Sequence, residues 1–240
     1  MGDLDLPSRP EFTPGMLAQT KRQIGAHGLK ISDLGSSSEM HIVDPDERAK
    51  QLAEGRKFVD LAQALESPYV RVFGNQIKGP HEEVIARVAD GLHQLGEYAA
   101  SRGVTIILES HGDFTNSPLL KEVLTKADSK GVALLWDAHH TFVEGHEDPE
   151  HTVAEMGQWI RHTHLKDSIV YGGERKYVFP GKGDVPMKRQ VTALRKIGYK
   201  GYYCLEWEKK WHPDLQEPEV AFPAYVEAMK TYFKEPLKTS

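Results

Sequence analysis

The sequence has a single cysteine, and it lacks both long apolar runs and blocks of basic residues. One cysteine, Cys204, excludes an intramolecular disulfide and a zinc site built from several cysteines, and it fits a reducing compartment. No stretch approaches the roughly 18 apolar residues of a membrane span. The N-terminal residues are acidic and lack the apolar region of a signal peptide. We therefore expect a cytoplasmic protein without a membrane partner.

The charge of the chain is mildly negative. The formal net charge is −5 at pH 7, and the isoelectric point is near 6.2. Binding to DNA begins with the neutralisation of phosphates by Lys and Arg, so this balance argues against a nucleic-acid partner. Hydrophobic residues make up 39% of the chain, enough for a sizeable core, and the length suits one domain over residues 1–240.

Short apolar segments alternate with longer amphipathic ones along the chain, a pattern typical of a parallel α/β fold. The apolar segments predict strands at residues 29–34, 69–73, 104–109, 132–137, 161–166 and 202–206. The amphipathic segments predict helices at residues 13–27, 44–65, 81–101, 118–130, 152–159, 186–197 and 218–233. The serine-rich residues 35–38 are expected to form a loop.

Six strand–helix units at this spacing predict a TIM-type (β/α)8 barrel in which two strands are not seen. The first helix has no strand before it, because residues 1–12 are polar and rich in proline. The expectation is a barrel that lacks its N-terminal β-α-β segment. The strand at 29–34 would then be an exposed edge, which favours a homo-oligomer.

Four of the predicted strands end in acids and histidines. In parallel barrels the carboxyl ends of the strands carry the active site. A single acid or histidine at such a position is usually a solvated or structural residue, but four consecutive endings of this kind predict a functional site. The residues concerned are Glu109 and His111, then Asp137, His139 and His140, then His162, His164 and Lys166, and finally Glu206 and Glu208.

Carboxylates with an imidazole form a ligand set for a divalent metal ion. The mixture of oxygen and nitrogen donors suits Mn²⁺ first, with Mg²⁺, Co²⁺ and Zn²⁺ as further candidates. One bound ion would also explain how three acids could converge without strong repulsion. We expect one divalent ion per chain.

The succession Leu108-Glu109-Ser-His111, Asp137-Ala-His139-His140, His162-Thr-His164-Leu-Lys166-Asp167 and Leu205-Glu206-Trp-Glu208 resembles the xylose isomerase-like TIM barrels of the sugar phosphate isomerase/epimerase superfamily. The segment Gly181-Lys-Gly183-Asp184-Val-Pro186 fits the same pattern.

The resemblance implies a role for each matching position. Glu109, Asp137, His164 and Glu206 match the metal ligands, and Glu109 and Glu206 also match the acid/base pair of the ketose epimerases. His140 matches a histidine that binds substrate, although strand alternation leaves His139 as an alternative. His111, Lys166 and Glu208 are further candidates for substrate contacts, and Lys166 could instead pair with Glu208. Val170 stands where the ketose epimerases have an arginine, and Arg175 is a candidate to replace it.

The resemblance implies a metal-dependent isomerase or epimerase of a small sugar or sugar phosphate, acting by proton transfer next to a carbonyl through an enediolate. Three alternatives remain open: a keto-inositol dehydratase, an abasic-site endonuclease of the same fold, and a sugar-binding protein without catalysis. The acidic net charge argues against the endonuclease.

Overall fold

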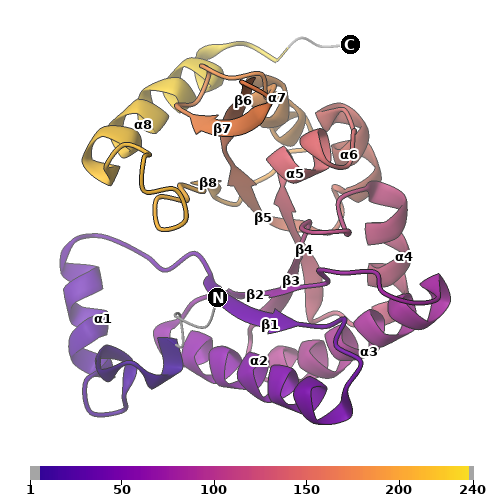
Figure 1. Cartoon of the computed structure of the whole chain (residues 1–240). Helices are drawn as coiled ribbons and strands as arrows, with labels where there is room; N and C mark the ends of the chain where they lie inside the picture. The colour runs from indigo at the N-terminus through magenta and orange to yellow at the C-terminus, as the bar shows by residue number, and fades with distance from the viewer. Residues whose placement is uncertain (1–5, 238–240) are drawn as a thin grey trace. The chain divides into compact units, whose positions relative to one another are not determined.

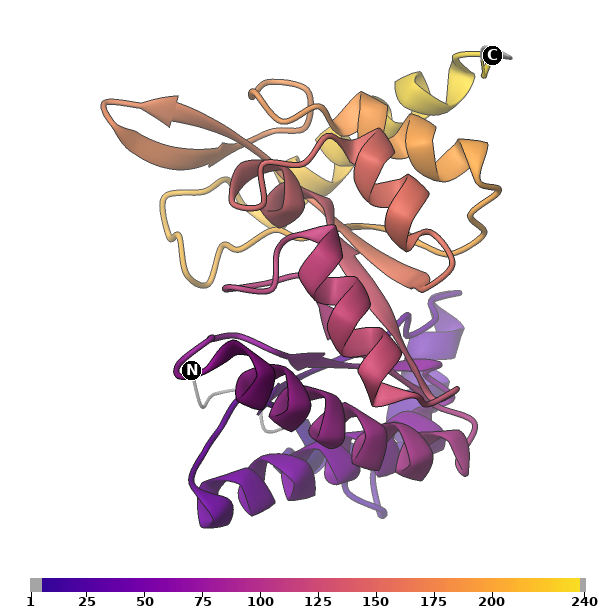
Figure 2. The ribbon, with the colours of Figure 1, turned by 90° about the vertical axis from the view of Figure 1, so that its right-hand side faces the viewer.

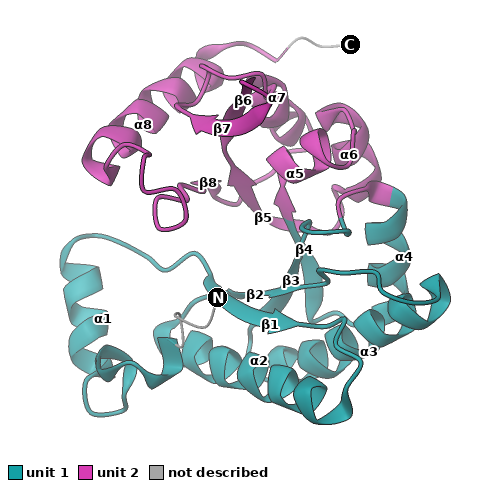
Figure 3. Cartoon of the chain, in the orientation of Figure 1, with its two compact units in different colours: residues 1–114, 118–135 teal, residues 115–117, 136–240 magenta. Residues whose placement is uncertain are grey.

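The computed structural model describes residues 6–237, and the chain divides into two compact units. Unit 1 holds residues 1–114 and 118–135, and unit 2 holds residues 115–117 and 136–240 (Figure 3). Strand β4 passes from one unit to the other between Leu135 and Trp136. Each unit is described separately below.

Unit 1 is built on parallel strands with a largely apolar interior. Its strands are β1 (Leu34–Glu39), β2 (Tyr69–Phe73), β3 (Thr105–Glu109) and the first residues of β4 (Val132–Asp137), paired in this order (Figure 1). Ile107, Ala133 and Leu135 form a buried cluster with Tyr69 packed against it. The register pairs Phe73 with Glu109 and Glu109 with Leu135, so the strands end at one edge.

One helix of unit 1 precedes its first strand, and the others follow β1, β2 and β3. They are α1 (Leu17–Ala26), α2 (Pro45–Leu65), α3 (His81–Ala100) and α4 (Ser117–Ala127), with two short 3₁₀ turns at Leu6–Ser8 and Pro10–Phe12. Helices α2 and α3 lie side by side, as Figures 1 and 2 both show. Helix α2 begins after Asp44, whose side chain accepts hydrogen bonds from the backbone N–H groups of Asp46 and Glu47, at 3.1 and 2.9 Å.

Unit 2 continues the same alternation and adds a hairpin. Strands β5 (Ile160–Leu165) and β8 (Tyr203–Leu205) are parallel neighbours, and β6 (Asp167–Tyr171) pairs antiparallel with β7 (Glu174–Val178). The helices are α5 (Ala138–Val143), α6 (Pro149–Met156), α7 (Met187–Lys196) and α8 (Pro218–Lys234). Within the described residues, no helix combines the length and apolar character needed to span a bilayer.

These elements confirm the predicted fold class. Six strands of one parallel sheet alternate with helices along the chain, as in a TIM-type barrel. Trp136 has no exposed surface, as expected for a core residue.

The prediction for the first strand is wrong. Residues 29–33 lie outside any strand, and the serine-rich segment predicted as a loop forms β1 instead. The strand is stable because its hydroxyl groups have partners: Ser36 donates to the carbonyl of Arg71 at 2.5 Å, and Ser38 donates to the carbonyl of Gln51. Small residues also leave room, because a Cβ on Gly35 would approach the Arg71 guanidinium at 3.1 Å.

Two elements of unit 2 were missing from the predicted set. No element was predicted where the β6–β7 hairpin forms, and its two-residue turn uses Gly172 and Gly173, with φ of 62° and 83°. Helix α5 begins directly after Asp137, where the prediction placed only the end of a strand. The helix expected at 152–159 instead runs over Pro149–Met156, with proline in its first turn.

Candidate active site at the strand ends

In unit 2 the candidate residues are aligned by the β5–β8 register. His164 pairs with Cys204, and Leu165 pairs with Leu205. Since side chains alternate along a strand, His164 shares a face with Cys204, Lys166 extends that face of β5, and Glu206 extends that face of β8. The backbone N–H of Glu206 donates to the carbonyl of Leu165 at 3.1 Å, which continues the pairing past the end of β8.

Asp137 caps helix α5 with one carboxylate oxygen and faces the site with the other. Its Oδ1 accepts hydrogen bonds from the backbone N–H groups of His139 and His140 at 2.9 and 3.0 Å. Its Oδ2 lies 2.9 Å from Nζ of Lys166, and the side chain is fully buried. The cap explains why α5 starts here, and it fixes the direction of the second oxygen.

Lys166 is the centre of this cluster. Its side chain is only 2% exposed, and Nζ contacts Asp137, Glu206 and Glu208, with Oε1 of Glu208 at 2.8 Å. Burial alone would lower the pKa of Lys166, but these three carboxylates raise it well above its usual range. Lys166 is therefore an ammonium ion shared by three acids, and the expected pairing with Glu208 is one part of a larger arrangement.

His164 and Glu206 form the second contact of the cluster. Nδ1 of His164 lies 3.2 Å from Oε1 of Glu206, while Oε2 of Glu206 contacts Lys166. Burial would raise the pKa of Glu206, but the nearby His164 and Lys166 hold it well below its usual range. Glu206 is thus a stable carboxylate and a weak base in this structure.

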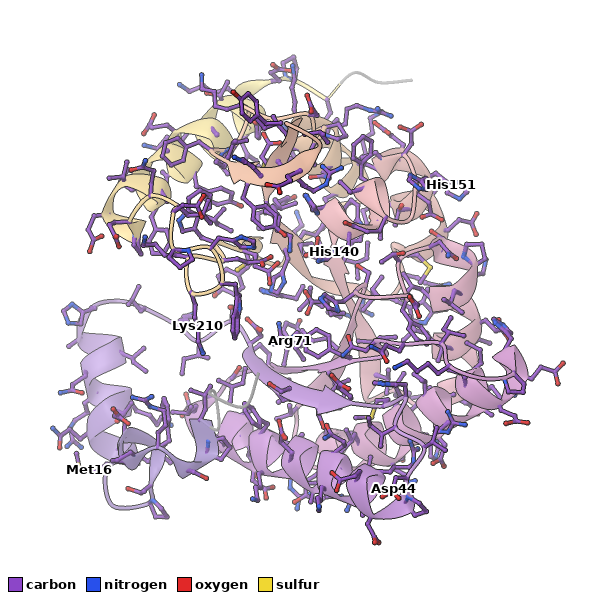
Figure 4. All side chains as sticks on the ribbon, in the orientation of Figure 1. Met16, Asp44, Arg71, His140, His151 and Lys210 are labelled. Atoms are coloured by element: carbon purple, nitrogen blue, oxygen red, sulfur yellow. The ribbon has the colours of Figure 1, made fainter. Side chains whose placement is uncertain are left out.

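His140 is held between an acid and the ammonium group. Its Nδ1 lies 3.1 Å from Oε2 of Glu144, and its Nε2 lies 3.2 Å from Nζ of Lys166 (Figure 4 labels His140). Burial opposes the charged imidazole, but Asp137 and Glu144 outweigh it and raise the pKa of His140. Because the lysine can only donate, Nε2 accepts this contact in the neutral ring, whose proton is then on Nδ1 and faces Glu144.

His139, the alternative to His140, has different contacts from it. It is 1% exposed, and its Nε2 lies 2.8 Å from Oγ of Ser168. Burial, together with the positive charge of Lys166, lowers the pKa of His139 to about 3, so it is neutral. Arg175 donates to the same Ser168 hydroxyl at 2.8 Å, which ties strand β7 to this network.

Asp167 follows Lys166 and organises the glycine loop. Its carboxylate accepts four backbone hydrogen bonds at 2.8 to 3.2 Å, from Ser168, Gly181, Gly183 and Val185. A Cβ on Gly183 would lie 2.2 Å from Oδ1 of Asp167, so only glycine allows this approach. The Gly181–Pro186 segment is therefore held against Asp167 by backbone hydrogen bonds.

In unit 1, Glu109 is paired with an arginine that the sequence reasoning missed. Glu109 is 1% exposed, and its Oε2 lies 3.1 Å from Nη1 of Arg71 (Figure 4 labels Arg71). Nη2 of Arg71 donates to the carbonyl of Ser36 at 3.2 Å, and the guanidinium lies 4.4 Å from the ring centroid of Phe73. A lone arginine in the otherwise apolar strand Tyr69–Phe73 was the available signal.

His111 lies in a separate polar chain of unit 1. Its Nδ1 is 2.9 Å from Oδ1 of Asn75, and the Asn75 amide donates to Glu39 at 2.6 Å. Asn75 has a positive φ of 56°, which asparagine tolerates better than most residues. Glu39 and Asn75 end β1 and follow β2, so they are additional strand-end residues that sequence reasoning did not select.

Within unit 2, the side chains suited to a metal are close enough to share one ion. Asp137, His164 and Glu206 each offer a ligand atom, and these atoms lie within 4.8 Å of one another. Ligands on opposite sides of a divalent ion are about 4 Å apart, so modest side-chain shifts would close the site. The donor set of two carboxylates and one imidazole suits such an ion.

The chain belongs to the xylose isomerase-like TIM barrel family, whose model matches residues 1–232. Its relatives are enzymes. An inosose dehydratase from Geobacillus thermodenitrificans is 26% identical, over 90% of this chain and 79% of the relative. The chain spans about half (51%) of an inosose dehydratase from Bacillus cereus that it matches at 30% identity.

Solved structures with lower sequence identity to this chain share its fold. The IolI protein, solved with a bound zinc atom, is 21% identical with a TM-score of 0.78, covering 91% of this chain and 83% of that one. A D-allulose 3-epimerase from Methylomonas sp. is 20% identical with a TM-score of 0.76, covering 92% of this chain and 84% of that one.

Proposed function

We propose that this chain is a divalent-metal-dependent dehydratase of a cyclic keto-polyol. The observation that carries the proposal is the contact between His140 and Lys166, a base and an acid 3.2 Å apart within one unit. The similarity to inosose dehydratases supports it. The substrate is a small sugar-like molecule.

The metal is proposed to bind Asp137, His164 and Glu206, with Glu109 as the fourth ligand. Glu109 is included on the sequence pattern alone, in which it matches a metal ligand of the family. Such an ion, with Mn²⁺ as the first candidate, would supply Lewis-acid polarisation of the substrate carbonyl. The similarity to a zinc-containing structure supports metal binding without selecting the ion.

His140 is proposed as the general base. Glu144 accepts from Nδ1 and orients the ring, which leaves Nε2 as the basic nitrogen. His140 takes the proton next to the carbonyl, and the carbon–oxygen bond at the adjacent carbon breaks. Lys166 donates a proton to the departing hydroxide, so water forms along with a carbon–carbon double bond. His140 then returns its proton to Lys166 across their contact, and both groups regain their starting states.

This assignment predicts the stereochemistry of the elimination. Because the acid and the base touch, the proton and the hydroxyl group should leave from the same face of the ring. Glu206 is assigned to the metal, since its contacts with Lys166 and His164 make it a poor base.

Epimerisation or isomerisation is the second candidate, with Glu109 and Glu206 as the acid/base pair. It is supported by the sequence pattern, in which both residues end predicted strands and match the acid/base pair of the ketose epimerases. The fold shared with D-allulose 3-epimerase is compatible with it.

The deciding experiment is a reaction with inosose and a panel of ketoses in D₂O with Mn²⁺. The dehydratase proposal expects loss of water from inosose, and a fall of about 10²-fold or more in turnover for His140→Asn. Epimerisation expects a new sugar epimer with deuterium at the carbon next to the carbonyl, and a loss in Glu206→Gln. Inactivity on the whole panel would contradict both candidates.

Metal binding is tested separately with Asp137→Asn. Asparagine also caps helices well, so this change removes a charged ligand and keeps the α5 cap. Its affinity for Mn²⁺ should fall about tenfold or more by titration. Asp148→Asn is the matched control, because Asp148 precedes α6 and its side chain pairs with Arg189. Equal affinities in both variants would remove Asp137 from the site.

A further inference from the structure

Unit 2 contains a cleft beside the proposed site that the chemistry above does not use. The cleft has a volume of about 400 Å³, within the range of small-molecule sites. It lies between the β6–β7 hairpin and the 207–216 loop, which run side by side in Figure 2. Most of its lining is aromatic or aliphatic, notably Ile169, Tyr177, Phe179, Trp207 and Leu215.

The aromatic wall of the cleft is held by its own loop. Phe179 and Trp207 stack with ring centroids 5.8 Å apart and planes 15° apart. The Trp207 indole N–H donates to the carbonyl of Gln216 at 2.8 Å and closes the loop. Lys209 braces the same loop by donating to the carbonyls of Pro213 and Leu215, at 2.9 and 2.7 Å. Trp207 is thus fixed before any ligand arrives, which lowers the entropic cost of binding.

Tyr177 connects the cleft to the lysine cluster. Its ring lines the cleft, and the ring centroid lies 5.7 Å from Nζ of Lys166. Trp207 stands between Glu206 and Glu208 in the sequence, and both glutamates contact the same lysine. A ligand held at the cluster could therefore place a substituent in the cleft.

We infer that the cleft binds a flat hydrophobic substituent of the substrate, so that the substrate is an aryl-substituted polyol such as a keto-glycoside with an aromatic aglycone. A bare polyol is covered with hydroxyl groups and would find few partners on this lining. An aromatic ring would stack on the indole and tyrosine rings, which prefer such neighbours. The inference rests on the proposed function, which places the polyol part of the substrate at the lysine cluster. The cleft would then hold the aromatic part of the same substrate.

The test compares two probes on the Mn²⁺-loaded full chain by isothermal titration. The probes are 4-nitrophenyl β-D-glucopyranoside and methyl β-D-glucopyranoside, which differ in the substituent. The nitrophenyl glucoside should bind about tenfold more tightly, the value of a good aromatic contact. Trp207→Ala should abolish this advantage. Trp211→Ala is the matched control, because Trp211 belongs to the same loop, is 47% exposed and is not among the residues that line the cleft.

A second readout guards against loss of folding in Trp207→Ala. The nitrophenyl group should quench tryptophan fluorescence in the native chain and in Trp211→Phe, and much less in Trp207→Phe. Equal binding of the two probes, no binding of either, or quenching that survives in Trp207→Phe would overturn the inference. Since binding is measured without turnover, an inactive enzyme that still binds the nitrophenyl glucoside through Trp207 would contradict only the proposed function.

Discussion

The two units neutralise their buried carboxylates with different cations. In unit 1, Glu109 faces the planar guanidinium of Arg71, which also donates to the backbone and stacks on Phe73. In unit 2, Asp137, Glu206 and Glu208 share the compact ammonium of Lys166. An arginine fixes one geometry, whereas an ammonium group can rotate among partners and exchange a proton. Unit 1 thus holds its acid with a cation of fixed geometry, whereas the proposed function uses the ammonium of unit 2 as a proton donor.

Removing the shared ammonium should have the largest effect. Lys166→Met leaves the buried Asp137 and the partly exposed Glu206 and Glu208 without their cation, so the free energy of unfolding in EDTA should fall by about 3–5 kcal/mol. Saturating Mn²⁺ should recover much of this loss, because the ion replaces the missing charge. Urea denaturation measures both. Lys188→Met, which removes an exposed lysine paired with Glu235, should change stability by less than about 1 kcal/mol. Equal losses in the two variants would contradict the comparison.

The arginine of unit 1 provides the second test. Arg71→Met should cost about 2–3 kcal/mol, because Arg71 keeps 18% of its side chain exposed while Glu109 is buried. If Glu109 is the fourth ligand, Mn²⁺ should restore stability here too. Arg56→Met is the control, since Arg56 lies near the Tyr98 ring and is not paired with a buried acid in the described contacts. Failure of Mn²⁺ to stabilise Arg71→Met would remove Glu109 from the proposed ligand set.

Asp167 receives hydrogen bonds from backbone N–H groups and, among the described contacts, has no cation like those of Glu109 and Asp137. Asp167→Asn keeps one acceptor oxygen and turns an NH₂ group toward the donors, so it should lower the unfolding free energy by about 1–3 kcal/mol. Adding Mn²⁺ should not restore the loss. The neighbouring Asp184→Asn, in an exposed side chain, should be nearly neutral. Thermal denaturation of both variants, with and without Mn²⁺, measures these effects.

The smallest effect concerns pH and unit 1. Burial lowers the pKa of His41 from its usual 6.5. The unfolded chain therefore binds more protons than the folded one below about pH 6.5, so this contribution is complete above that pH and is lost as pH falls. His41→Gln should reduce the slope of unfolding free energy against pH between 7.5 and 5.5 by at most about 1.4 kcal/mol per unit. An unchanged slope, matching that of the exposed His27→Gln, would contradict the assignment.

The sequence predicted the elements whose apolar pattern matches their final burial. Strand β4 was predicted at its observed bounds, because its six residues are all buried and five of them are apolar, with Asp137 at the end. Strand β1 was missed because its stability comes from serine hydroxyl bonds and from space beside Gly35, and neither leaves a hydrophobic pattern. The hairpin was missed because half of its residues are exposed, so its strands lack the alternating apolar pattern of a strand with one buried face.

The sequence likewise predicted some features of the site and missed others. Strand endings indicated Asp137, His164 and Glu206, which the β4 end and the β5–β8 register bring together in unit 2. The pairing of Lys166 with Glu208 was among the predictions, but its contacts with Asp137 and Glu206 could not be predicted, because they depend on how far a flexible side chain reaches. Nor could the orienting role of Glu144, which depends on the unpredicted helix α5.

The register between β5 and β8 gives the molecule a native chemical reporter. Cys204, the one cysteine in the sequence, pairs with His164 and is partly exposed. Each molecule can therefore take up one alkyl group from a reagent such as iodoacetamide, at a position beside a proposed metal ligand. An ion that immobilises His164 should slow this labelling. Counting the mass-shifted fraction over time would then report metal occupancy in the unmutated chain.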